Sequence, residues 1–138
     1  MRRAFMVGIS VGLASGLLLG PAVHRAQAIK PFEMEFYAKY LKPNSSDPKD
    51  KAYTELVYNA KCFVCHEGKS KKSRNAYGRQ LAELLDKDTD KDNKQKIDEA
   101  LDKVARMHID PKNVHSPTFG DLIAAGKLPG GESQKGEQ

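Results

Sequence analysis

"NAKCFVCHEG", residues 59 to 68, contains both cysteines of this 138-residue chain, and a histidine follows the second cysteine directly. Cys62, Cys65 and His66 therefore form a Cys-x-x-Cys-His motif. Three kinds of chemistry use cysteines at this spacing: a redox dithiol, a metal site and the covalent attachment of a haem. The rest of the chain has to discriminate between them.

The segments before the motif have helical patterns. Residues 30–41 place aromatic side chains on one side of a predicted first helix. Asp47 followed by Pro48 is a good helix start, and the second helix is predicted to run from there to about Ala60. Its predicted inward residues are Ala52, Leu56, Val57 and Ala60. Cys62 would then follow directly after the end of this helix.

The segments after the motif are also predicted to be helical. Helices are expected over 75–85 and 96–109, and a short one is expected after an N-cap at Ser116 or Thr118, with Gly126 as its stop. No stretch shows the sustained alternation of a strand. The sequence thus predicts an all-α fold with a frayed tail from about residue 130.

The amino terminus has the order of a signal peptide. Arg2 and Arg3 precede an uncharged stretch over residues 4–20, and small residues at Ala26 and Ala28 offer a cleavage site. The predicted organisation is therefore a signal peptide over 1–28 and one domain over 29–138. An uncleaved membrane anchor is the alternative. Either way the protein is expected to be exported, to the periplasm or a similar compartment, with no membrane attachment once the signal is cleaved.

Removal of the predicted signal peptide lowers the net charge of the chain. The whole chain has 23 Lys and Arg against 18 Asp and Glu, but three of the arginines lie in the signal. The remaining 110 residues have 20 against 18, a net charge of +2. Neither this balance nor any basic-aromatic motif supports nucleic-acid binding.

The motif can now be assigned by elimination. A redox Cys-x-x-Cys belongs near a βαβ pattern, which is missing from the sequence. Zinc would need a second ligand pair, and the spacing of His108 and His115 is too long for the usual one. A disulfide between Cys62 and Cys65 would close too small a loop to stabilise much. Covalent haem c remains: two cysteines three residues apart reach the vinyl groups on one porphyrin edge, and the next histidine binds the iron.

With this motif, a signal peptide and helices on both sides, the sequence resembles the small monohaem c-type cytochromes of the bacterial periplasm. Residues 68–78, "GKSKKSRNAYG", and 116–131, "SPTFGDLIAAGKLPGG", also resemble a subgroup with a Lys-rich loop after the motif. The resemblance implies a class I-like helical domain wrapped round one covalent haem c. It also implies thioether bonds to Cys62 and Cys65 and His66 as the proximal iron ligand.

The function expected from such a haem is electron transfer and not enzymatic catalysis, because an iron with two protein ligands cycles between ferrous and ferric without binding substrate. Two alternatives stay open. One is a gas-binding haem protein or weak peroxidase with an open or displaceable distal site. The other is a haem subunit that works inside a larger redox complex.

The distal ligand departs from the family pattern, which has a methionine in a loop near the C-terminal end. After the signal, the chain has only Met34 and Met107, and neither lies in a recognisable ligand loop. His108 is the first choice, because it continues the apolar face of the helix over 96–109. His115 and Met107 are the alternatives.

The loop after the motif is basic. Lys69, Lys71, Lys72 and Arg74 follow His66 closely. They are either an ordinary solvated loop or a positive patch, near an exposed haem edge, that steers an acidic redox partner.

Overall fold

The computed structural model describes residues 30–68 and 72–131. The predicted signal peptide and the part of the predicted C-terminal tail after residue 131 lie outside these ranges. The described part is all-α, as predicted. It contains five α-helices, one short 3-10 helix and two isolated β-bridges, and no strand occurs within these ranges. The order is α1 (Lys30–Tyr40), α2 (Pro48–Ala60), η1 (Lys61–Val64), α3 (Ala76–Leu84), α4 (Lys94–Ala105) and α5 (Phe119–Ala124).

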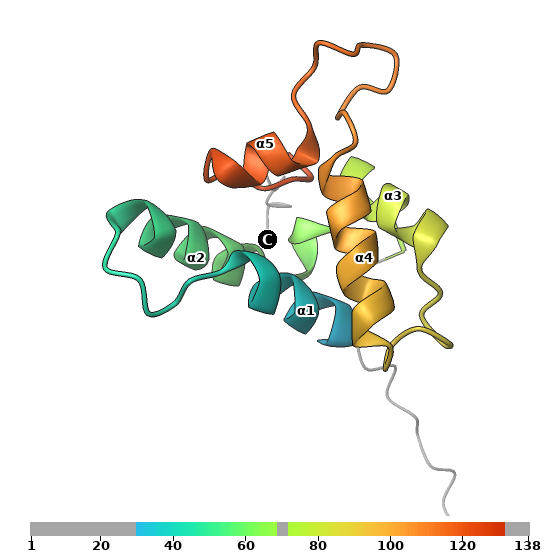
Figure 1. Cartoon of the computed structure of the whole chain (residues 1–138), viewed down its shortest axis with the longest axis horizontal. Coiled ribbons are helices and arrows are strands. Elements are labelled where there is room, and N and C mark those ends of the chain that lie inside the picture. Colours follow the sequence, from blue (N-terminus) through green and yellow to red (C-terminus); the bar gives the residue numbers. More distant parts are fainter. Residues whose placement is uncertain (1–29, 69–71, 132–138) are drawn as a thin grey trace, which may run out of the picture.

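Helix α4 is the centre of the arrangement, because it packs against α1, α3 and α5 (Figure 1). Its inward face consists of Ile97, Ala100, Leu101 and Val104, which are all buried. Ion pairs tie α1 to its outer face, since Lys39 Nζ lies 2.6 Å from a carboxylate oxygen of Asp98 and 2.9 Å from one of Asp102.

The core is aromatic at its middle. The ring of Tyr77 in α3 contacts Phe36 of α1 at a centroid distance of 6.0 Å and Phe119 of α5 at 5.4 Å. All three side chains are at most 2% exposed. Each buried ring removes a large apolar area from water, which favours the folded state.

Helix α2 starts as predicted, with Asp47 as its N-cap accepting a hydrogen bond from the N–H of Lys49. Its inward face is partly different from the predicted one. Val57 and Ala60 are buried, but Tyr53 and Thr54 are buried in place of Ala52 and Leu56, which are exposed. The prediction preferred aliphatic residues, whereas the contacts of α2 place a tyrosine inward.

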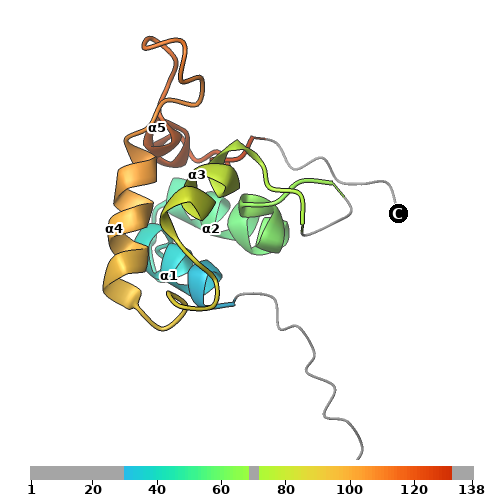
Figure 2. The same ribbon diagram turned by 90° about the vertical axis from the view of Figure 1, so that its right-hand side faces the viewer.

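Helix α4 is shorter than predicted, because it ends at Ala105 instead of continuing to residue 109. The chain then forms a projecting loop over residues 106–118 (Figure 2). The neck of this loop is a β-bridge between His108 and Thr118. His108 therefore does not lie on the apolar face of a helix, and the helical argument for its role was wrong.

Helix α5 confirms the prediction of its cap. Thr118 and Asp121 form a reciprocal capping box, in which each side chain accepts a hydrogen bond from the backbone N–H of the other. Gly126 follows the helix with a φ of +71°, a conformation that favours glycine at a helix stop.

Candidate functional site

The Cys-x-x-Cys-His motif begins where α2 ends, at a sharp change of direction. Lys61 has a φ of +50°, which residues other than glycine seldom adopt. The following 3-10 turn folds back on Cys62, whose carbonyl oxygen accepts hydrogen bonds from the N–H groups of Cys65 (3.2 Å) and His66 (3.0 Å). One backbone oxygen thus holds the three motif residues around a single turn.

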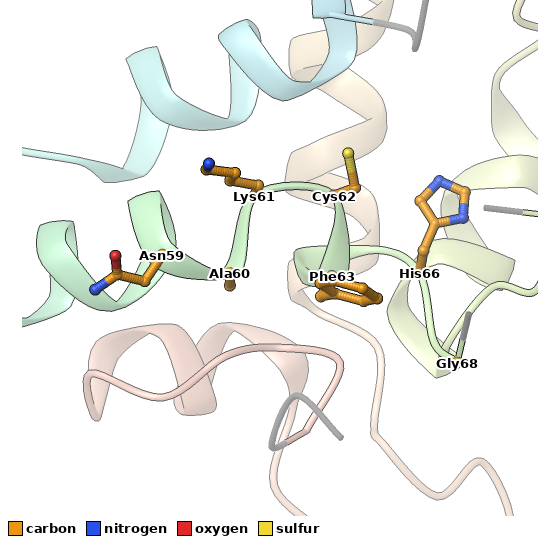
Figure 3. Close-up of a pocket in the computed structure, with 7 residues that line it drawn as sticks. All are labelled: Asn59, Ala60, Lys61, Cys62, Phe63, His66 and Gly68. Atoms are coloured by element: carbon orange, nitrogen blue, oxygen red, sulfur yellow. The ribbon is translucent and has the colours of Figure 1, made fainter. Parts of the chain in front are cut away.

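A pocket of about 290 Å³ lies against this turn. We call it the motif pocket; it is lined by Asn59, Ala60, Lys61, Cys62, Phe63, His66 and Gly68. Figure 3 shows the Cys62 sulfur and the His66 ring on the same side of the turn, and the Phe63 ring on the other. The volume is at the lower end for sites that enclose a drug-sized ligand, so a porphyrin would extend beyond it.

The imidazole of His66 is oriented by the loop that follows it. Its Nδ1 lies 3.2 Å from the carbonyl oxygen of Ser73. A carbonyl can only accept, so this contact requires a proton on Nδ1, and the lone pair of a neutral ring is then on Nε2. A β-bridge between His66 and Arg74 fixes the same loop. His66 therefore presents one free, oriented nitrogen, which is what an iron ligand needs.

Neither cysteine is in a disulfide. Burial, followed by electrostatic interactions with Glu33 and Cys62, raises the pKa of the partly buried Cys65 to about 12. The Cys65 thiol is consequently protonated at neutral pH and is a poor attacking group for disulfide exchange. Only Cys62 lines the motif pocket, whereas Cys65 packs against the hydrophobic core.

Three buried hydroxyl groups in the described part of the chain have no hydrogen-bond partner: those of Tyr53, Thr54 and Tyr77. Burial, and then interactions with Tyr40 and Cys65, raise the pKa of Tyr77, whose ring lies in the core between Phe36 and Phe119. Buried hydroxyls without partners are uncommon in native proteins. None of these three residues lines the motif pocket, so their hydroxyls do not identify a ligand for it.

Two candidates for the distal ligand line a different pocket. This second pocket, of about 460 Å³, is lined by Ala76, Arg79, Gln80, Met107, His108, Ile109, Pro111 and Phe119. It shares no lining residue with the motif pocket. His108 Nδ1 is bonded to the carbonyl oxygen of Ser116, which leaves its Nε2 free in the same way as in His66.

The remaining ligand candidates are exposed. His115 lies in the projecting loop, where its N–H donates to Asn113 Oδ1. Met34 lies on α1 and is 57% exposed. The structure thus brings together Cys62, Cys65 and His66, and it leaves the distal candidates apart from them.

The basic loop is described only in part. Lys69 and Lys71 lie outside the described residues, while Lys72 and Arg74 are exposed. The carbonyl oxygen of Arg74 accepts a hydrogen bond of 2.7 Å from Arg79, which also lies 3.5 Å from a carboxylate oxygen of Glu67.

Two residues behind the motif were missed by the sequence interpretation. Gly78 packs so closely that a Cβ there would lie 1.9 Å from the carbonyl oxygen of Cys65. Asn75 is buried and bonds the motif from inside. An asparagine before a helical pattern indicates an N-cap, but its inward bonds join residues about ten positions apart and leave no trace in the pattern.

Comparisons of the chain with protein-family models, with curated proteins and with solved structures give no match. Within the two described ranges, no three His, Cys, Asp or Glu side chains gather as a metal site would require. Nor do those ranges include a helix with the length and apolarity needed to span a bilayer.

Proposed function

We propose that this protein is an exported electron carrier with one haem c, bound covalently by Cys62 and Cys65 and ligated by His66. The observation that carries the proposal is the geometry of the motif turn. Two unpaired cysteines stand beside a histidine whose Nδ1 is bonded to Ser73, so that Nε2 is free. This combination suits attachment of a haem at one edge and ligation of its iron from one side.

The cysteines would supply the attachment. Each cysteine would add its S–H bond across one vinyl group, so that an S–C bond and a C–H bond would replace the S–H bond and the vinyl π bond. No oxidant or reductant is consumed. The raised pKa of Cys65 keeps its thiol in the protonated form that carries this hydrogen.

His66 would supply the proximal ligand. The hydrogen bond from its Nδ1 to Ser73 fixes the orientation of the ring. When bound, the haem supplies an iron that cycles between ferrous and ferric, with a potential set by its axial ligands and burial.

A second candidate function is gas binding or weak peroxidase activity at an open distal position. One observation favours it: among the described residues, the motif pocket is lined by no second histidine and by no methionine. A haem there would keep an open site unless Met107, His108 or His115 approached it.

Carbon monoxide separates the two functions, because it binds ferrous haem only where an axial position is open. For the electron carrier we expect the visible spectrum of the reduced protein to stay unchanged after carbon monoxide is added. A rapid shift of the main absorption band would contradict the carrier and support the gas-binding alternative.

The basic loop is proposed as the docking surface for an acidic redox partner. Replacement of Lys69, Lys71, Lys72 and Arg74 by Gln is expected to slow electron transfer by about tenfold at low salt, because steering by charge raises association rates. The difference should close at high salt, where charges are screened beyond a few ångströms.

The matched control carries four Lys→Gln changes at exposed positions on other elements, namely Lys49, Lys51, Lys103 and Lys112. Stopped-flow rates against salt concentration give the comparison. Equal slowing in both variants would show that net charge, and not this loop, steers the partner.

A further inference from the structure

Asn75 lies behind the motif turn, and both polar atoms of its side chain form hydrogen bonds. The residue is only 4% exposed. Its Oδ1 accepts a hydrogen bond of 2.9 Å from the N–H of Gly78, which makes Asn75 the N-cap of α3. Its Nδ2 points the other way, into the motif, and lies 3.1 Å from the carbonyl oxygen of Val64 and 3.2 Å from that of Phe63.

These two carbonyls belong to the turn between the cysteines. The last carbonyls of a helical turn have no partner within it, so they need a donor from elsewhere. The amide of Asn75 has two N–H groups and supplies both bonds. A third carbonyl, that of His66, lies 3.5 Å from the same nitrogen. The backbone N–H of Asn75 also donates to Cys65 O at 3.2 Å.

The C-terminal segment closes over Asn75 from the other side. Leu128 and Pro129 are buried. A Cβ at Gly130 would lie 1.9 Å from Asn75 Nδ2, so only glycine permits this approach. Three segments far apart in sequence, 62–66, 75–78 and 128–130, thus meet at one amide group.

We infer that Asn75 is the positioning residue of the attachment motif: its amide N–H groups hold the Phe63 and Val64 carbonyls, and so fix the spacing of Cys62, Cys65 and His66 for a haem. This inference rests on the proposed function. Asn75 touches no reacting atom. It acts through the backbone that carries the two sulfurs and the imidazole.

Asn75→Asp separates this role from helix capping. Aspartate has nearly the same size and is an equally good N-cap, so α3 keeps its start. It offers no N–H, however, and would place an oxygen against the buried Val64 carbonyl and the partly buried Phe63 carbonyl. We expect the fraction of folded chains with both thioether bonds to fall by about tenfold, because unpaired carbonyls destabilise the turn that sets the spacing of the cysteines.

Asn93→Asp is the matched control. Asn93 is the exposed N-cap of α4, where its Oδ1 accepts from the N–H of Lys96 at 3.0 Å. Asn93 forms its capping hydrogen bond through Oδ1, which aspartate also has. Haem attachment in Asn93→Asp should therefore equal that in the unchanged protein. A third variant, Asn75→Ser, keeps a neutral capping oxygen and removes both amide N–H groups without adding charge; its single, shorter O–H cannot replace the two bonds. It decides the question if the aspartate variant fails to accumulate.

Two measurements on the full chain, exported in a host that assembles haem c, test the inference. The first is haem per folded chain, with the folded fraction from circular dichroism. The second is the pyridine haemochrome band, whose position differs between one and two thioether bonds. A purely structural role would lower the amount of folded protein and leave both quantities unchanged.

The outcomes distinguish this inference from the function on which it rests. An unchanged protein without covalent haem would overturn the proposed function. An unchanged protein with haem, together with Asn75 variants of normal haem content and band position, would overturn the role of Asn75 alone. Reduced attachment in the Asn75 variants and normal attachment in Asn93→Asp would support it.

Discussion

The double variant Cys62→Ala, Cys65→Ala is expected to lose all covalent haem. These are the only cysteines in the chain, so no other sulfur could form a thioether. A denaturing gel stained for haem-dependent peroxidase activity measures the effect directly, because denaturation releases any haem that is held without a covalent bond. The band of the unchanged protein should stain, and that of the double variant should not.

The two single variants are the controls for this result. Each keeps one sulfur beside the motif turn and should keep a covalent haem, with a haemochrome band shifted toward that of a single thioether. A double variant that still stains would show that the haem is attached elsewhere, and the assignment of Cys62 and Cys65 would then be wrong.

The second large effect is expected at the distal ligand, where His108→Ala should convert a low-spin haem to high-spin and open it to carbon monoxide. His108 has its Nδ1 bonded to Ser116, so its Nε2 is the free nitrogen, as in His66. Bis-histidine ligation also predicts a lower reduction potential than ligation by histidine and methionine.

Met107→Ala and His115→Ala complete this series. Both should stay low-spin if His108 is the ligand. Absorption spectra with and without carbon monoxide give the spin state and the open position of each variant. A low-spin His108→Ala protein with an unchanged spectrum would rule His108 out, and the variant that becomes high-spin would identify the true ligand.

The helices could be predicted because their signals are local. Asp47 before Pro48 marks the start of α2, and Thr118 with Asp121 marks that of α5, without reference to any distant residue. Which residues of α2 face the core could not be predicted from the sequence pattern alone. Tyr53 and Leu56 are both apolar enough to be buried, and only the packing of α2 against the rest of the core selects Tyr53.

The end of α4 could not be predicted from periodicity. The apolar spacing continues through His108, yet the chain leaves the helix after Ala105. The reason is a pairing with a segment about ten residues later: Phe119 N–H donates to Met107 O, and Ile109 N–H donates to Pro117 O, each at 3.0 Å. Such bonds compete with the next helical turn, and the pattern of side chains does not record them.

Part of the candidate site could be predicted from the sequence, and part of it could not. Cys62, Cys65 and His66 are adjacent in sequence, so their grouping follows from the motif itself. The contributions of Ser73, Asn75 and Gly130 depend on long-range contacts, namely a carbonyl oxygen, an amide and the absence of a side chain. Each of these residue types is common in loops, which is why the sequence alone does not single them out.

The most direct test of the central claim is the intact mass of the exported, unchanged protein after denaturation. We expect one species, heavier than the polypeptide by a single haem, and a haemochrome band of the two-thioether type. A mass equal to that of the polypeptide alone, from a host that attaches haem to a control cytochrome c, would contradict the proposal that this chain carries haem c.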